Sequence, residues 1–194
     1  LVGTQMIVKG HDFPNVTLVG VLAADMSLYT DDYRSGERTF QLLTQAAGRA
    51  GRGERPGDVV IQTYDPGHYA IEAAAAQDYE MFYEQETAYR EMMGYPPAEN
   101  LTAVHVSCED EELLEKGCHY LKEYILRIKG KVPVQVIGPA SPGIDKIRDV
   151  YRRVIYLKSP RYDTLVKIKD MMEKYIEINS GFDKMRIQFD FNPM

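Results

Sequence analysis

Two arginines that lie three residues apart, Arg49 and Arg52, are the side chains most suited to chemistry. They close the segment QAAGRAGR, residues 45–52. On a helical turn a spacing of three places both side chains on one face, and the small neighbours allow another surface to approach closely. A planar guanidinium suits a triphosphate, and an arginine that reaches a γ-phosphate stabilises the charge on the transferring group. The alternative is a glycine-rich helix end with two solvated arginines.

A second polar segment, residues 3–14, has the composition of a loop that contacts phosphates. Its sequence is GTQMIVKGHDFP. Hydroxyl, amide and ammonium groups of Thr4, Gln5 and Lys9, together with exposed backbone N–H groups, suit a nucleic-acid backbone. Asp12 suits a ribose hydroxyl or an arginine partner. The alternative is a polar turn that leads into the next strand.

Positive charge is concentrated late in the chain, although the net charge is −6. Residues 131–169 hold nine Lys and Arg against three Asp, and local fields matter more for binding than the total. Arg152 and Arg153 are predicted in a strand, where side chains alternate, so only one of them can face a given ligand. We take Arg152 as a candidate DNA contact. A solvated sheet edge is the alternative.

Composition argues against a metal site and a membrane span. Cys108 and Cys118 lack any neighbouring His or Cys at ligand spacing, so no metal is expected on this chain. Two separated thiols fit a cytoplasmic protein with reduced cysteines. No run of 18 apolar residues is present, which argues against a membrane partner.

The elements that must position these residues fall into two patterns, the first of which occupies residues 1–67. Val16–Ala24 and Val59–Ile61 are apolar runs without polar alternation, as in strands buried on both faces of a parallel sheet. Residues 36–50 between them favour a helix, and Met6–Val8 favours a further short strand. Strands separated by helices indicate an α/β unit with a parallel sheet.

The second pattern follows a predicted long connecting helix at 68–97, which the two prolines Pro96 and Pro97 end. Residues 98–194 alternate strands with two helices, one capped by Asp110 and one starting at Ser159-Pro160. A loop is expected at 138–143. The order β-α-β-β-α-β predicts an α+β domain of ferredoxin-like type. Its strands are expected at 101–108, 132–136, 150–158 and 185–191.

Together the two polar segments are more specific than either alone. GTQMIVKGHDFPNVTLVGVLAAD followed by QLLTQAAGRAGRG resembles motifs V and VI of superfamily-two helicases, in the wording of the PriA family of primosomal replication-restart helicases. The resemblance continues through YREMMGYPP at 89–97 and DFNP at 190–193, so it covers essentially the whole chain. On this resemblance the chain is expected to be the C-terminal part of a longer enzyme, with residues 1–67 forming the second half of a RecA-like helicase lobe.

The resemblance also implies an activity and partners. The full enzyme would use ATP and Mg²⁺ to unwind DNA in the 3′→5′ sense at stalled forks and would direct primosome assembly. Its zinc would be bound by a segment absent from this chain. The expected partners are single-stranded and forked DNA, the acidic tail of the single-strand-binding protein, and other primosome proteins.

Residue roles carry over by motif. Arg49 and Arg52 would face ATP that is bound mainly by another lobe. One departure stands out, because Ala46 occupies a position where many superfamily-two helicases carry Arg, so the site would hold one basic contact fewer. The resemblance places Gln45, Gly48, Gly10 and Asp12 on the nucleotide side, and Thr4, Gln5 and Lys9 on the single-stranded DNA.

Two motor motifs are missing from the sequence. It contains no G-x-x-x-x-G-K-[ST] phosphate loop and no DExH box, and those residues hold the phosphates and Mg²⁺. This chain alone is therefore expected not to hydrolyse ATP. The competing hypothesis is a non-enzymatic docking module, in which a ferredoxin-like domain binds DNA or protein.

Overall fold

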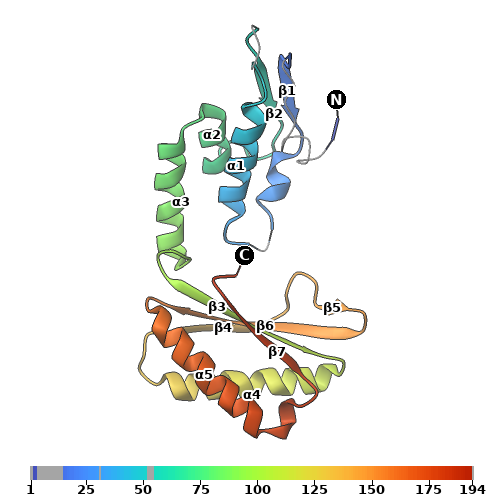
Figure 1. Cartoon of the computed structure of the whole chain (residues 1–194), viewed down its shortest axis with the longest axis vertical. Helices are drawn as coiled ribbons and strands as arrows, with labels where there is room; N and C mark the ends of the chain where they lie inside the picture. Colours follow the sequence, from blue (N-terminus) through green and yellow to red (C-terminus); the bar gives the residue numbers. More distant parts are fainter. Residues whose placement is uncertain (1, 4–14, 31, 52–54, 194) are drawn as a thin grey trace. The chain divides into compact units, whose positions relative to one another are not determined.

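The computed structural model describes residues 2–3, 15–30, 32–51 and 55–193. The chain divides into two compact units, Leu1–Tyr89 and Arg90–Met194, which we call the N-terminal and C-terminal units (Figure 1). Each has a hydrophobic core of its own. The chain is a mixed α/β protein with one parallel two-stranded sheet and one antiparallel sheet.

The N-terminal unit is built on a parallel strand pair, as predicted. The prediction that both faces of these strands are buried is wrong, because exposed and partly buried positions alternate along each strand. Strand β1 (Leu18–Val21) pairs with β2 (Asp58–Ile61), with Val19 opposite Val59. The 3-10 helix η2 (Ala24–Ser27) and helix α1 (Ser35–Ala47) lie between them in sequence. The predicted strand Met6–Val8 lies outside the described residues.

The segment predicted as one long helix is instead two helices. Helix α2 (Tyr69–Ala76) ends at Gln77, whose φ of 53° is left-handed, and α3 (Tyr79–Met93) starts two residues later. The Asp78 side chain accepts a hydrogen bond from the backbone N–H of Met81 at 2.9 Å, which caps the new helix. The apolar stripe had suggested continuity, but the left-handed conformation of Gln77 ends the first helix.

Aromatic stacking closes the core of the N-terminal unit. Phe40 of α1 and Phe82 of α3 are stacked with ring centroids 4.2 Å apart. Glu86, which interrupts the apolar stripe of α3, is buried and accepts a hydrogen bond from the Tyr69 hydroxyl at 2.6 Å. The Tyr69 hydroxyl and the Glu86 carboxylate both lie close to Gly36 at the start of α1, so a side chain at position 36 would clash with them.

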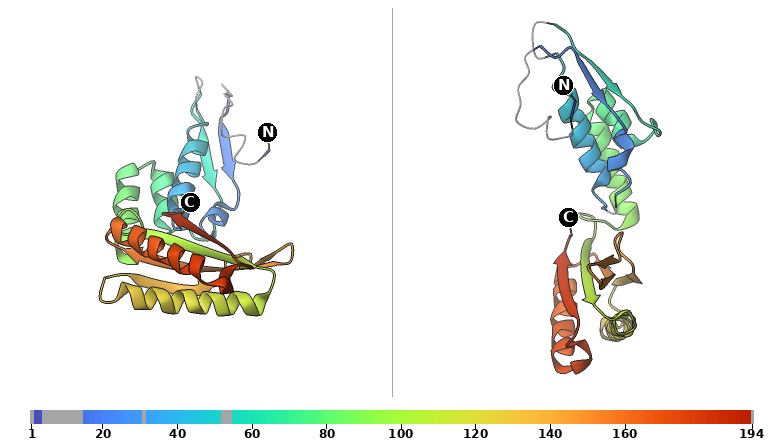
Figure 2. Two further views of the ribbon diagram at one scale, coloured as in Figure 1. Left: turned by 60° about the horizontal axis from the view of Figure 1, so that its bottom comes forward. Right: turned by 90° about the vertical axis from the view of Figure 1, so that its right-hand side faces the viewer.

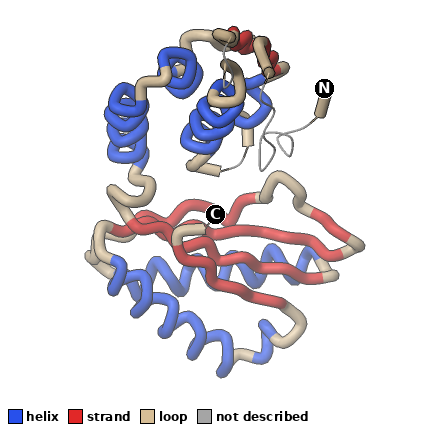
Figure 3. The backbone as a smooth tube through the Cα atoms, turned by 45° about the horizontal axis from the view of Figure 1, so that its top comes forward, coloured by secondary structure: helices blue, strands red, loops and turns tan. Residues whose placement is uncertain are grey.

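The C-terminal unit is built on a five-stranded antiparallel sheet, in which four strands follow the order β4-β6-β3-β7 and the short strand β5 pairs with β6. Figure 3 shows helices α4 and α5 on one side of this sheet, and Figure 2 gives two further views. The apolar residues of α4, α5 and the facing strand positions form its core. The elements in chain order are β3 (Asn100–Cys108), α4 (Glu111–Lys129), β4 (Gln135–Ala140), β5 (Lys146–Ile147), β6 (Val150–Ser159), α5 (Tyr162–Ile178), η3 (Ser180–Phe182) and β7 (Arg186–Phe191).

Local signals explain most of these boundaries. Asp110 caps α4 as predicted, since its carboxylate accepts from the backbone N–H of Leu113 at 3.0 Å. The predicted loop at 138–143 is partly strand, because β4 continues through an irregularity to Ala140. Gly138 permits this, since a Cβ there would lie 2.7 Å from the Val154 carbonyl oxygen. Helix α5 starts two residues later than predicted, because Ser159 still belongs to β6 and pairs with Asn100 of β3.

Candidate functional site

The arginine-containing segment leaves the helix earlier than its spacing suggested. Helix α1 ends at Ala47 with Gly48 as its C-cap, and the next residues form a turn in which the Arg49 backbone N–H donates to the Ala46 carbonyl at 3.0 Å. The prediction that residues 36–50 form one helix is therefore wrong at its end. Arg49 lies in a turn, so the argument from helical spacing does not apply to it.

This turn is held close to the parallel strands. The Gly51 backbone N–H donates to the Val16 carbonyl at 2.9 Å. Gly51 has a φ of 71°, and a Cβ at Gly57 would lie 2.3 Å from the Gly51 nitrogen, so glycine is required on both sides of the contact. The small residues of this turn therefore allow a close approach, as predicted, but the surface that approaches them is the chain's own segment before β2.

The predicted nucleotide-side residues in the described part of this segment differ in exposure. Gln45 and Gly48 are exposed, one turn apart at the end of α1. Arg49 is half-buried, and its Nε atom is enclosed by protein. Gln45 and Gly48 are thus accessible to a ligand. The roles proposed for the other residues stay predictions, because these lie outside the described residues: Thr4, Gln5, Lys9, Gly10, Asp12 and Arg52.

A buried carboxylate that sequence reasoning missed organises the loop after β2. Asp25 in η2 is 4% exposed. It accepts hydrogen bonds from the Thr63 hydroxyl, from the Tyr64 backbone N–H at 2.9 Å and from that of Asp65 at 3.2 Å. The Thr63 bond, followed by that from Tyr64, holds the pKa of Asp25 below its ordinary value. An acidic residue directly after an apolar strand was the available signal.

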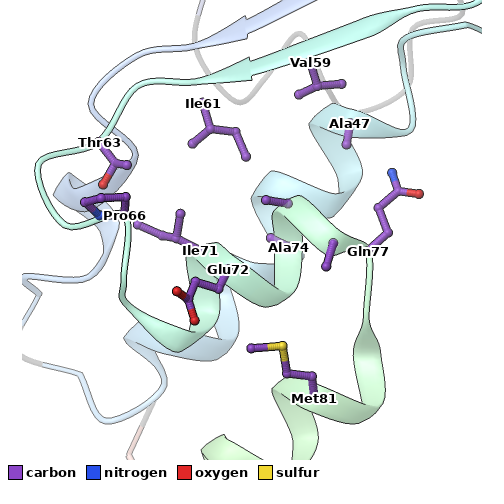
Figure 4. Close-up of a pocket in the computed structure, with 12 residues that line it drawn as sticks. Ala47, Val59, Ile61, Thr63, Pro66, Ile71, Glu72, Ala74, Gln77 and Met81 are labelled. Atoms are coloured by element: carbon purple, nitrogen blue, oxygen red, sulfur yellow. The ribbon is translucent and has the colours of Figure 1, made fainter.

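A hollow of about 700 Å³ lies between β2 and the helices of the N-terminal unit. In Figure 4 the labelled side chains of Val59, Ile61 and Ile71 surround it. Glu72 and Gln77 are the polar residues at its margin, with Thr63 of the loop after β2. An apolar hollow without convergent polar groups favours packing over catalysis.

In the C-terminal unit the two adjacent arginines of β6 face opposite ways, as alternation predicted. The Arg153 guanidinium lies on the helix side, where Nε is 2.6 Å from Glu115 and Nη2 is 3.3 Å from Glu111. Arg152 lies on the other side, in a recess with His105 and Gln188. Within the described ranges the Arg152 side chain forms no ion pair or hydrogen bond. Arg152 is therefore the arginine available to a ligand.

The thiols and carboxylates of the described residues form no cluster of three that could hold a metal. Cys108 and Cys118 are both buried as free thiols, and burial raises the pKa of Cys118 to about 12. Of the helices that the structure describes, none is long and apolar enough to cross a bilayer.

Comparisons with known proteins show the family of the chain. Residues 91–194 match the family model "Primosomal protein N C-terminal domain". The chain is 45% identical to the replication restart protein PriA of Bacillus subtilis, covering all of this chain and 24% of the relative. It is 40% identical to PriA of Synechocystis, covering 96% of this chain and 23% of the relative. It is 34% identical to PriA of Haemophilus influenzae, covering 100% of this chain and 26% of the relative.

The second half of this mixed α/β chain is therefore a primosomal protein N C-terminal domain. The whole chain belongs to the PriA family of replication restart proteins. The chain spans about a quarter of the length of the curated relatives it matches. Among solved structures, the de novo designed protein Foldit4 covers 48% of this chain at 13% identity and a TM-score of 0.37.

Proposed function

We propose that this chain is part of an ATP-dependent DNA helicase that unwinds stalled replication forks in the 3′→5′ sense and directs primosome assembly in the cytoplasm. The observation that carries the proposal is the match to PriA proteins along the whole chain, including the segment of Gln45, Gly48 and Arg49. A docking module would need only the C-terminal unit. The family resemblance extends across the N-terminal unit as well.

The N-terminal unit fits the second half of a RecA-like lobe. Parallel sheets are ordinarily covered on both faces, yet one face of the β1–β2 pair is exposed: Leu18 is 63% exposed, Val60 57%, and Leu22 just beyond β1 80%. Such a surface is suited to packing within a larger sheet of the complete enzyme. The turn that carries Arg49 lies beside the starts of both strands.

Within this lobe we assign the nucleotide side of the cleft to the end of α1. Exposed Gln45 and Gly48 would contact ATP, while Arg49 and Arg52 would stabilise charge on the transferring phosphoryl group. Phosphate and Mg²⁺ would be held by residues that this sequence does not contain, so this chain alone would not hydrolyse ATP. The preceding polar segment would supply Gly10 and Asp12 to the nucleotide, and Thr4, Gln5 and Lys9 to the DNA.

The C-terminal unit fits a ferredoxin-like docking domain. Its strand order β4-β6-β3-β7 with two helices on one side supports that assignment. A domain of this kind offers one helix-covered face and one sheet face for binding. We assign to this unit contacts with forked DNA, with the tail of the single-strand-binding protein and with other primosome proteins.

The test uses the complete polypeptide that contains this chain. Arg52→Ala and Arg49→Ala are each expected to lower DNA-stimulated ATPase by roughly 10³-fold or more, the range known for arginine fingers. ATP binding measured with a fluorescent analogue should change far less. Lys174→Ala, which removes an exposed charge from α5, is the matched control and should leave ATPase unchanged.

Two results would contradict the proposal. Wild-type ATPase in Arg52→Ala with the native circular dichroism spectrum retained would remove the arginine-finger role. A complete polypeptide that binds forked DNA but shows no ATPase under any condition would instead support the docking module.

A further inference from the structure

The sheet of the C-terminal unit carries a polar face opposite its helices. Strand register places three rows across β6, β3 and β7 on this face. One row is Arg152–Ser107–Arg186, the next is Val154–His105–Gln188, and the third is Tyr156–Ala103–Asp190. Neighbouring strands lie about 4.8 Å apart, so the Cα atoms of the two arginines are about 10 Å apart with the serine between them.

One end of this face is covered and the other is open. At the covered end the buried Lys158 ammonium donates to the Met93 carbonyl at 2.7 Å and lies 3.8 Å from the centroid of the Tyr95 ring. At the open end Arg186 and Gln188 are exposed. The arginine row is therefore the part of the face that a ligand can reach.

The two arginines of this row lack acidic partners. Arg152 and Arg186 form no ion pair with any described residue, whereas Arg153, on the helix face, is paired with Glu111 and Glu115. Asp145 lies opposite Arg152, since its carbonyl accepts from the Arg152 backbone N–H at 2.8 Å, but no ion pair joins the two side chains. Asp190 is two rows away. Two guanidinium groups outside any ion pair leave positive charge available on an otherwise acidic protein.

A recess opens beside Arg152 in this row. It measures about 170 Å³, and the other residues that line it are His105, Val106, Ser107, Pro142, Arg153 and Gln188. That volume equals about six water molecules at roughly 30 Å³ each, well below the roughly 300 Å³ of the smallest drug-sized sites. The recess can hold one small polar group of a longer ligand, and a complete nucleotide would not fit.

The side chains around the recess indicate the chemistry of that group. Arginine, serine and glutamine are among the donors that contact DNA phosphate and sugar oxygens. Burial, together with the nearby Arg152, lowers the pKa of His105, and Asp190 acts in the opposite direction. The lowered pKa favours the neutral imidazole, which can donate or accept a hydrogen bond. A serine between two guanidinium groups, with His105 and Gln188 in the next row, suits a chain of phosphodiesters better than a lone carboxylate.

We propose that the Arg152–Ser107–Arg186 row binds the sugar-phosphate backbone of single-stranded DNA, with one phosphate in the recess beside Arg152 and another at Arg186. This deepens the proposed function, on which it rests, by naming Arg186, Ser107, His105 and Gln188 as contacts. Binding through phosphates predicts little preference among base sequences.

The test measures binding of this chain to a fluorescein-labelled oligothymidylate of about 20 nucleotides by anisotropy, at low salt. Arg152→Ala and Arg186→Ala are each expected to weaken binding by roughly tenfold. Each should also reduce the slope of log K against log salt by about 0.7, the value for one phosphate contact in a single strand. Arg152→Lys should retain the slope while losing affinity, because it keeps the charge without the planar fork.

Lys174→Ala, on α5 in the same unit, is the matched control and should change neither affinity nor slope. Amide NMR shifts of the wild-type chain supply a second measurement, which does not depend on whether a variant folds. The oligonucleotide should shift the resonances of His105, Ser107 and Gln188. Unchanged shifts there, despite binding, would overturn the proposed site.

The outcomes separate this site from the wider proposal. Unaltered DNA binding by both arginine variants would remove the site while leaving the helicase assignment intact. The proposed site does not require that the Arg152 and Arg186 variants lose DNA-stimulated ATPase in the complete polypeptide. If a short aspartate-rich peptide shifts the same amides and the oligonucleotide does not, the row is a protein-docking surface and the DNA proposal is wrong.

Discussion

The Nε atom of Arg153 lies 2.6 Å from a carboxylate oxygen of Glu115, which ties strand β6 to helix α4. The arginine side chain is only 12% exposed, and Glu111 provides a second carboxylate. Arg153→Ala should therefore lower the free energy of unfolding by about 1 kcal/mol. Urea unfolding at pH 7 measures this, and the loss should shrink in 1 M salt. Arg152→Ala is the control and should stay within about 0.5 kcal/mol.

The position of Arg152 can be tested without any ligand through the titration of His105. Burial chiefly lowers the pKa of this histidine, Arg152 lowers it further, and Asp190 raises it. Arg152→Ala should therefore raise the pKa of His105, and Asp190→Asn should lower it. Histidine NMR titration of both variants checks the two directions. A pKa of His105 that is indifferent to both changes would contradict the row geometry.

Asp25 should give the N-terminal unit an acid-sensitive stability. Hydrogen bonds, first from Thr63 and then from Tyr64, lower its pKa in the folded state below the reference value of 3.8. A lowered carboxyl pKa stabilises the fold above pH 4, and this contribution is lost as the pH falls below that value. Asp25→Asn should unfold at a lower temperature than the wild type at pH 6, with a smaller difference at pH 3. Thermal scans at both pH values measure this, with the exposed Asp58→Asn as the control.

Gly36 should be among the least replaceable residues of α1. A Cβ there would lie 2.6 Å from the Tyr69 hydroxyl and 2.8 Å from a Glu86 oxygen. Gly36→Ala should cost roughly 1–3 kcal/mol of unfolding free energy, although alanine ordinarily stabilises a helix by about 1 kcal/mol over glycine. Gly67→Ala, with no atom near its added Cβ, is the control for calorimetry. A Gly36→Ala protein as stable as this control would disprove the contact.

Sequence periodicity predicted the elements well where one local signal dominated. The alternation in β6 correctly placed Arg152 and Arg153 on opposite faces. The Asp110 cap correctly marked the start of α4. The uninterrupted apolar runs correctly indicated a parallel pair, but they wrongly predicted that both of its faces are buried. In each case the residue pattern and the tertiary packing demand the same conformation.

Prediction failed where packing overrode the local pattern. The stripe across residues 68–93 has helical period throughout, yet Gln77 adopts a left-handed conformation and separates α2 from α3. The helix predicted to reach residue 50 stops at Ala47, because the next turn bonds to the start of β1 through Gly51. The Asp25 network was also missed, since its partners lie nearly 40 residues away in sequence.

Both native cysteines lie in the core of the C-terminal unit, which makes thiol labelling of the chain practicable. Cys108 is 4% exposed and Cys118 is fully buried, and burial raises the pKa of Cys118 to about 12, which disfavours its reactive thiolate. A reporter cysteine introduced at exposed Gln188 would therefore react with a maleimide dye while Cys118 stays unmodified. That dye would sit at the rim of the Arg152 recess and report occupancy directly, without removal of the native thiols.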